Sequence, residues 1–140
     1  MTDFVELRLA NDLDGLAGLA GRVERFGAEH HLSANMVNAI NVVLDEAVSN
    51  AINHGYDAGV RGEIAVRLRR GADRIEIEVE DDGRPFDPLQ APPPDLTLPL
   101  DQRPIGGLGV HLIRNLMDEV SYARRDGRNV LKMAKYLATT

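Results

Sequence analysis

The stretch NMVNAINVVLDEAVSNAINHG, Asn35–Gly55, decides the fold of this chain. Its apolar residues recur at intervals of three and four, a spacing that predicts an amphipathic helix with one face in the protein core. Ser33 lies just before the helix as a capping residue, and Gly55 marks its end. The residues of the buried face are Val37, Ile40, Leu44, Ala47, Val48 and Ala51.

A polar stripe runs beside this buried face. Glu46, Asn50 and His54 follow one another at intervals of four residues, so they lie on one side of the predicted helix. Together they offer a general base, an oxygen ligand for magnesium and a donor toward phosphate, which are the groups that phosphoryl transfer uses. On this helix alone, a solvated polar face is the simpler interpretation. Two motifs farther along the chain favour a functional one.

The rest of the chain predicts a sheet that packs against this helix. Apolar and charged residues alternate in the expected strands, and the turns Gly71–Asp73 and Asp126–Gly127 predict antiparallel hairpins. A helix capped by Asn11 or Asp12 is expected after the first strand, and a third helix over Leu108–Leu116. We expect an α/β (α+β) two-layer sandwich, with a mixed, largely antiparallel sheet of about five strands covered on one face by three helices. The apolar residues of the first helix are Leu13, Leu16, Leu19, Val23 and Phe26.

The length and composition of the chain exclude several classes of function. At 140 residues the chain is predicted to form a single domain, 1–140, with room for one core. A net charge of −6 argues against direct binding of nucleic acid or of an anionic membrane, because both need a basic face. The absence of cysteine excludes a disulfide framework, a thiolate nucleophile and a cysteine zinc site. Since the sequence shows no signal peptide and no membrane-spanning segment, we expect a cytoplasmic protein.

The first downstream motif lies at the end of the central hairpin. Asp81 is in phase with the apolar residues of the strand before it, so its carboxylate is expected to point toward the core. A charged group is rarely placed there without a partner. One interpretation is an acceptor for an exocyclic amine such as that of adenine, with Gly83 leaving room for a flat ligand. The other is a plain turn, because Asp-Asp-Gly is common turn chemistry.

The second motif follows an unusual loop. All seven prolines lie between Pro85 and Pro104, where neither a helical nor a strand period is present, so we predict a lid over about 84–105. The loop closes on Gly106-Gly107-Leu108-Gly109, immediately before a helix. Exposed amides and the positive end of the helix dipole make such a junction a phosphate site, although glycines are also frequent in plain hinges.

In this order, the three motifs resemble those of the GHKL ATPase superfamily, which includes gyrase-type and histidine-kinase ATP-binding domains. Glu46–Gly55 is similar to its N-box, Asp81–Pro88 to its first glycine box, and Gly107–Val110 to its second. Within the superfamily, the small domain size and the amino-acid sequence from Glu46 to Tyr56 most resemble the anti-sigma factor serine/threonine kinases of bacterial partner-switching systems. The resemblance covers essentially the whole chain.

This resemblance implies ATP and Mg²⁺ as cofactors, bound between the sheet and the lid. It makes Asn50 a magnesium ligand and Asp81 the acceptor for the adenine amine. His54 would either approach the phosphates or complement the negative end of its helix. The cofactor-binding residues that follow are Asn50, His54, Asp81, Gly83, Gly107, Leu108 and Gly109.

The same resemblance implies catalysis and partners. Glu46 would act as the catalytic base toward a serine or threonine hydroxyl of a partner protein, an anti-sigma antagonist. A sigma factor as a second partner and a homodimer are also suggested by the resemblance. Two positions depart from the family pattern: Pro85 stands where a second glycine is common, and Asn129 where relatives often carry a hydroxyl residue near the adenine.

Three functions remain open from the sequence. The leading one is an ATP-dependent protein serine/threonine kinase and anti-sigma-type regulator that binds and phosphorylates a small antagonist. The alternatives are a nucleotide-gated protein-binding module without kinase activity and the ATP-binding domain of a histidine-kinase pathway. The presence of Glu46 favours the kinase over the binding module. A histidine-kinase pathway would usually need a histidine-bearing dimerisation helix, which we do not expect here.

Overall fold

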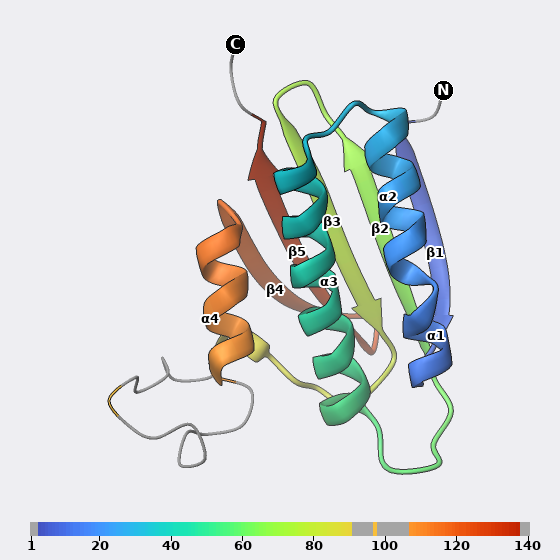
Figure 1. The fold of residues 1–140 in the computed structure, drawn as a ribbon. Helices are drawn as coiled ribbons and strands as arrows, with labels where there is room; N and C mark the ends of the chain where they lie inside the picture. The colour runs from blue at the N-terminus through green and yellow to red at the C-terminus, as the bar shows by residue number, and fades with distance from the viewer. Residues whose placement is uncertain (1–2, 91–96, 98–106, 138–140) are drawn as a thin grey trace.

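A computed structural model describes residues 3–90, 97 and 107–137 of the chain (Figure 1). A five-stranded sheet forms its back layer, with strand order β1-β2-β3-β5-β4. All four pairings of neighbouring strands are antiparallel, so the predicted fold class is confirmed, but the sheet is antiparallel throughout rather than mixed. The strands are β1 (Phe4–Ala10), β2 (Glu63–Arg70), β3 (Arg74–Asp81), β4 (Glu119–Arg125) and β5 (Arg128–Tyr136).

The helices cover one face of this sheet (Figure 1). Ser33 caps the central helix by accepting a hydrogen bond from the backbone N–H of Met36, 3.1 Å away, and the helix ends at Gly55 as predicted. Of the two candidate caps for the first helix, Asp12 holds this position by accepting from the backbone N–H of Gly15 at 2.8 Å. The helical segments are α1 (Leu13–Ala17), α2 (Leu19–Glu29), α3 (Ala34–Gly55), α4 (Gly107–Leu116) and the short 3₁₀ helix η1 (Pro88–Gln90).

The first predicted helix differs in one respect from the structure. It was expected to be continuous from Leu13 to Phe26, but it is interrupted at Gly18, which separates α1 from α2. Glycine has a low helix propensity because its backbone loses more conformational freedom than that of alanine on helix formation. The apolar spacing continues across the break, which explains why periodicity alone did not reveal it.

The core lies between α3 and the middle of the sheet. Ile40, Leu44 and Val48 of α3 are fully buried, as the spacing of the opening stretch predicted. Burial of each such side chain contributes roughly 1.5–3 kcal/mol, so this face of α3 is a large part of what stabilises the fold. The strand residues that complete the core are Leu7, Ile64, Val66, Leu68, Ile75, Ile77, Val79, Leu131 and Met133.

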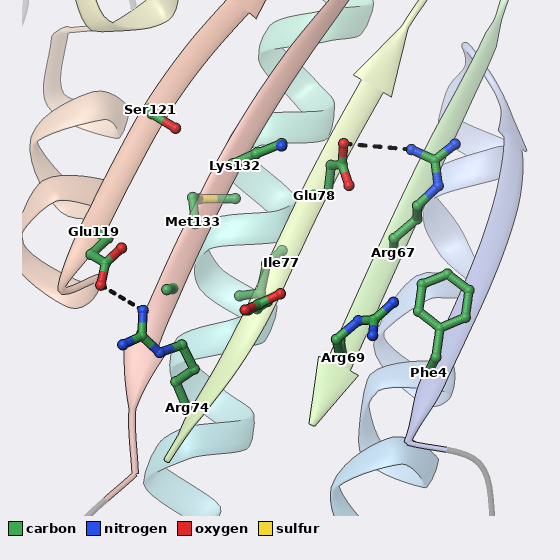
Figure 2. A pocket seen from close by; sticks show the side chains of 12 residues that line it. Phe4, Arg67, Arg69, Arg74, Ile77, Glu78, Glu119, Ser121, Lys132 and Met133 are labelled. Atoms are coloured by element: carbon green, nitrogen blue, oxygen red, sulfur yellow. Dashed lines mark hydrogen bonds and ion pairs between the residues drawn. The ribbon is translucent and has the colours of Figure 1, made fainter. Parts of the chain in front are cut away.

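The other face of the sheet is charged, as expected from the alternation of apolar and charged residues in the predicted strands. Figure 2 shows this face, with Arg67 next to Glu78 and Arg74 next to Glu119. Their closest nitrogen–oxygen distances are 3.8 Å and 2.7 Å. Exposed ion pairs contribute little to stability, roughly 0–1 kcal/mol each, so this face mainly keeps the sheet hydrated. Within the described residues, no helix is both long and apolar enough to cross a bilayer.

Candidate active site

The candidate site lies where the C-terminal half of α3 meets the ends of β3 and β5. A small cavity of about 30 Å³ marks the place. Asn50 of α3 and Asp81 of β3 both line it, so the structure brings together two of the sequence-predicted residues. The full lining is Ala47, Asn50, Ala51, Val79, Asp81, Phe86, Pro88, Tyr122, Asn129 and Leu131.

Asp81 is buried, with 6% of its surface exposed, as its phase in the strand predicted. Its Oδ1 accepts hydrogen bonds from the backbone N–H of Gly83 and from Nδ2 of Asn129, each 2.9 Å long. Burial raises the pKa of this carboxyl group, while the hydrogen bonds from Asn129 and Gly83 act in the opposite direction. Among the described residues, Oδ2 has no hydrogen-bond partner, so this oxygen is available as an acceptor for a ligand.

Asn129 and Tyr122 complete this end of the cavity. The register places Asn129 of β5 directly opposite Asp81 of β3. The hydroxyl of Tyr122 donates to Oδ1 of Asn129 at 2.5 Å. Sequence reasoning marked Asn129 only as a departure from the family pattern and missed Tyr122. The sequence signal for Asn129 is its phase, since it lies on the same face of its strand as the core residues Leu131 and Met133.

The structure gives a reason for glycine at position 83 that the sequence did not reveal. A Cβ atom at this position would lie 2.5 Å from the carbonyl oxygen and 2.8 Å from the Cα atom of Gly55. The missing side chain therefore makes room for the end of α3. The backbone N–H of Arg84 donates to the same Gly55 carbonyl at 2.8 Å, which ties the loop to the helix. Direct contact between Gly83 and a flat ligand stays a prediction.

Glu46 lies against the first turn of α4. A Cβ atom on Gly109 would come within 2.9 Å of the Glu46 Cδ atom, so the glycine leaves the space that the carboxylate occupies. Gly107 and Leu108 form the start of the same helix, as expected for the second glycine motif. The amino-terminal end of a helix carries partial positive charge and unpaired amides. Glu46 therefore sits beside a backbone suited to phosphate.

Substitution of Gly109 by alanine tests this packing. We expect the added methyl group to push the flexible Glu46 side chain aside, because the atom it meets is the end of that side chain. The free energy of unfolding should change by less than about 1 kcal/mol, whereas any activity that depends on Glu46 should fall at least about tenfold. Urea unfolding together with a phosphate-transfer assay checks both. Gly21→Ala is a matched control, since open space surrounds Gly21. Unchanged transfer in Gly109→Ala would contradict the expected role of this contact.

The His54 ring stacks on Phe86, which lies within the first glycine motif. The two ring centroids are 4.4 Å apart and the ring planes differ by 11°. Arg84 forms an ion pair with Asp57 in the same region. His54 thus helps to position the segment that leads away from Asp81, and a direct role toward phosphate stays a prediction.

The described residues offer Asn50 as the metal-site candidate. In the described part of the chain, no group of three or more His, Cys, Asp or Glu residues is arranged so that it could hold a metal ion. Asn50 is half-buried and presents the oxygen chemistry that Mg²⁺ accepts. Because Mg²⁺ usually retains waters and binds phosphate oxygens with only one or two protein ligands, a lone amide fits this ion. The predicted lid, about 84–105, is described only up to Gln90 and at Thr97; its remaining residues lie outside the described ranges.

Comparison with known proteins shows the family of this chain. Residues 9–135 match the model of the histidine kinase-like ATPase domain. The chain belongs to this family, which confirms the resemblance inferred from the three motifs. More particularly, it is 32% identical over 116 residues to the serine/threonine-protein kinase BtrW of Bordetella bronchiseptica, covering 83% of this chain and 82% of BtrW. It is also 33% identical over 123 residues to the serine-protein kinase RsbW of Bacillus cereus, covering 85% of this chain and 73% of that relative.

The fold is shared with a solved structure. The crystal structure of the RsbU and RsbW domains of Rv1364c from Mycobacterium tuberculosis superposes with a TM-score of 0.68. The match covers 96% of this chain and 32% of the larger one, at 18% sequence identity. At that identity the likeness concerns the fold.

Proposed function

We propose that this protein is an ATP-dependent protein serine/threonine kinase that binds and phosphorylates a small, serine-bearing anti-sigma antagonist in a partner-switching pathway. The observation that carries the proposal is the placement of the Glu46 carboxylate against the first turn of α4, one helical turn from Asn50. The names of the relatives, which are protein kinases, support the same activity. A sigma factor as a second partner, a homodimer and a cytoplasmic location are further proposals that rest on the family resemblance.

The proposed mechanism gives each group a separate task. Asp81 accepts a hydrogen bond from the adenine amine, and the backbone at Gly107–Gly109 binds the phosphates. Asn50 would hold Mg²⁺, and the bound ion would supply neutralisation of charge on the phosphates. Glu46 takes the proton of the substrate serine. At the same time the serine oxygen forms a bond to the γ-phosphorus, and the bond between this phosphorus and the ADP oxygen breaks. Positioning and charge neutralisation carry most of the catalysis in this type of reaction.

Transfer of labelled γ-phosphate tests the proposal. The protein is incubated with labelled ATP, Mg²⁺ and a candidate antagonist, and the modified residue is mapped. We expect phosphoserine on the antagonist that depends on both the metal and this protein. If the protein binds ATP and its antagonist but never transfers phosphate, the kinase proposal fails and a nucleotide-gated binding module replaces it.

Asp81→Asn tests recognition of the base. Loss of the ionised acceptor should weaken ATP binding by about 10–100-fold, because hydrogen bonds to charged groups contribute roughly 1.5–3 kcal/mol. Titration with ATP and GTP measures the effect, and Asp82→Asn serves as a control because Asp82 is exposed and bonded to Tyr56 instead. Equal affinity of the unmodified protein for the two bases would remove Asp81 from this role.

The acidity of Asp81 adds a pH dependence to this binding. Burial raises the pKa of the carboxyl group, so it takes up a proton at a higher pH than an ordinary aspartate. A protonated Asp81 cannot act as the ionised acceptor. ATP affinity of the unmodified protein should therefore start to fall, on acidification, at a pH above the usual aspartate range, and Asp81→Asn should lack this step.

A further inference from the structure

We propose that Asn129 is the positioning residue that sets base selectivity, by holding Asp81 as the acceptor for the adenine amine without itself contacting the base. This inference deepens the proposed ATP binding and rests on it. The hydrogen bonds of the Asn129 side chain carry this inference.

The side-chain amide of Asn129 is fully hydrogen-bonded within the protein. Nδ2 donates to Oδ1 of Asp81 at 2.9 Å and to the backbone carbonyl of Arg84 at 2.8 Å. Oδ1 accepts from the backbone N–H of Phe86 at 3.2 Å and from the Tyr122 hydroxyl at 2.5 Å. Two donors and two acceptor sites are the whole capacity of a carboxamide. Asn129 therefore has no hydrogen-bonding group left for a nucleobase.

These four bonds also determine which way the amide faces. If the amide were rotated by half a turn, its oxygen would face the Asp81 carboxylate and the Arg84 carbonyl, and its NH₂ would face the N–H of Phe86. Each of these contacts would pair like with like, so the observed orientation is the stable one. The amide is 6% exposed, and an unpaired polar group at this depth is unfavourable. Nδ2 is consequently held toward Asp81.

The orientation of Asp81 makes it an acceptor that distinguishes adenine from bases with a 6-carbonyl group. Asn129 and the Gly83 N–H both donate to Oδ1 of Asp81, and no other described residue bonds to Oδ2, which leaves this oxygen for the ligand. Adenine presents an amino group at the 6-position, whereas guanine and hypoxanthine present a carbonyl oxygen there, which a carboxylate repels. Selectivity for adenine then depends on Asp81 staying ionised and correctly turned. Asn129 supports both conditions through one hydrogen bond.

Tyr122 acts on the base site through Asn129. It lies on the edge strand β4, one strand beyond β5, and its hydroxyl meets Oδ1 of the amide. Tyr122→Phe keeps the ring in the cavity wall and removes only this bond. The variant therefore loosens the amide without creating a hole.

The experiment compares binding of ATP with that of inosine triphosphate, which carries a 6-carbonyl in place of the amine. In the unmodified protein, ATP should bind about tenfold or more tighter. Asn129→Leu should lower the affinity for ATP and leave that for inosine triphosphate unchanged, so that their ratio falls by about tenfold. Tyr122→Phe should lower the ratio a few-fold. Tyr136→Phe is the matched control, because Tyr136 donates an equally short hydrogen bond, 2.5 Å, to Glu119 away from the site.

The possible outcomes separate this inference from the proposed function. If the unmodified protein binds neither nucleotide, the proposed ATP binding itself fails. If it prefers ATP but both variants weaken the two nucleotides in parallel, or leave the ratio as it was, Asn129 is merely structural and the inference is overturned. Thermal unfolding shows whether Asn129→Leu is folded, and where it is not, Tyr122→Phe decides alone.

Discussion

Glu46→Gln should retain ATP binding within about twofold and lower the rate of phosphate transfer by about 10²–10⁴-fold, which is the usual contribution of a general base. Glutamine keeps the shape of the side chain and its place beside Gly109, but it cannot take the proton of the attacking hydroxyl. As the proposed base, Glu46 would act on the incoming serine and not on adenine, so nucleotide affinity should not depend on it. Parallel measurement of nucleotide affinity and of labelled phosphate transfer gives both numbers.

Two neighbours on α3 serve as references for this result. Asp45→Asn changes an exposed carboxylate next in sequence and should leave both quantities unaltered. Asn50→Ala should lower both, because loss of a magnesium ligand weakens the hold on the phosphates as well as their activation. Transfer that survives in Glu46→Gln at the unmodified rate would show that another group accepts the proton.

Gly83→Ala should destabilise the fold by about 3 kcal/mol, the upper part of the range for overpacked sites. The added methyl group would meet the carbonyl oxygen, Cα and carbonyl carbon of Gly55 at 2.5–2.9 Å. These are backbone atoms at the end of a buried helix, and they cannot turn away as a side chain can. Since a domain is stable by only about 5–15 kcal/mol, the loss should be plain in urea unfolding.

A second glycine provides a control, because its replacement by alanine should raise the free energy of unfolding instead of lowering it. Gly21 lies within α2, where an added Cβ atom meets nothing within 4 Å. Gly21→Ala should therefore stabilise the protein by up to about 1 kcal/mol, the difference in helix propensity between the two residues. If Gly83→Ala proved as stable as the unmodified protein, the close approach of the loop to Gly55 would not be needed for folding.

Much of the fold was predictable because periodicity depends on local sequence. The helix over Ala34–Gly55 and the alternating strands follow from spacings of three, four and two residues, and these spacings also placed Asp81 on the core side. The helix break at Gly18 could not be predicted, because the apolar spacing continues through it. Local pattern also gave no reason to prefer an all-antiparallel sheet over a mixed one.

The parts of the site that could not be predicted from the sequence depend on contacts between residues far apart in the chain. The space that Gly109 leaves for Glu46 and the space that Gly83 leaves for Gly55 exist only after α3, α4 and the β3 loop have packed together. The four hydrogen bonds of Asn129 likewise join β3, β4 and the loop after β3. A glycine or an asparagine in a sequence does not say which backbone it will meet.

The strand order has a consequence for how the protein folds during synthesis. Strand β5 follows β4 in the chain but lies between β3 and β4 in the sheet. Until residues 128–136 have left the ribosome, β3 is an edge strand that pairs with β2 on one side and has unpaired backbone groups on the other, and Asp81 lacks the partner that β5 supplies. If nucleotide binds at Asp81 as proposed, it would bind most tightly to a chain in which β5 has been inserted, and ATP would then stabilise the folded protein late in synthesis.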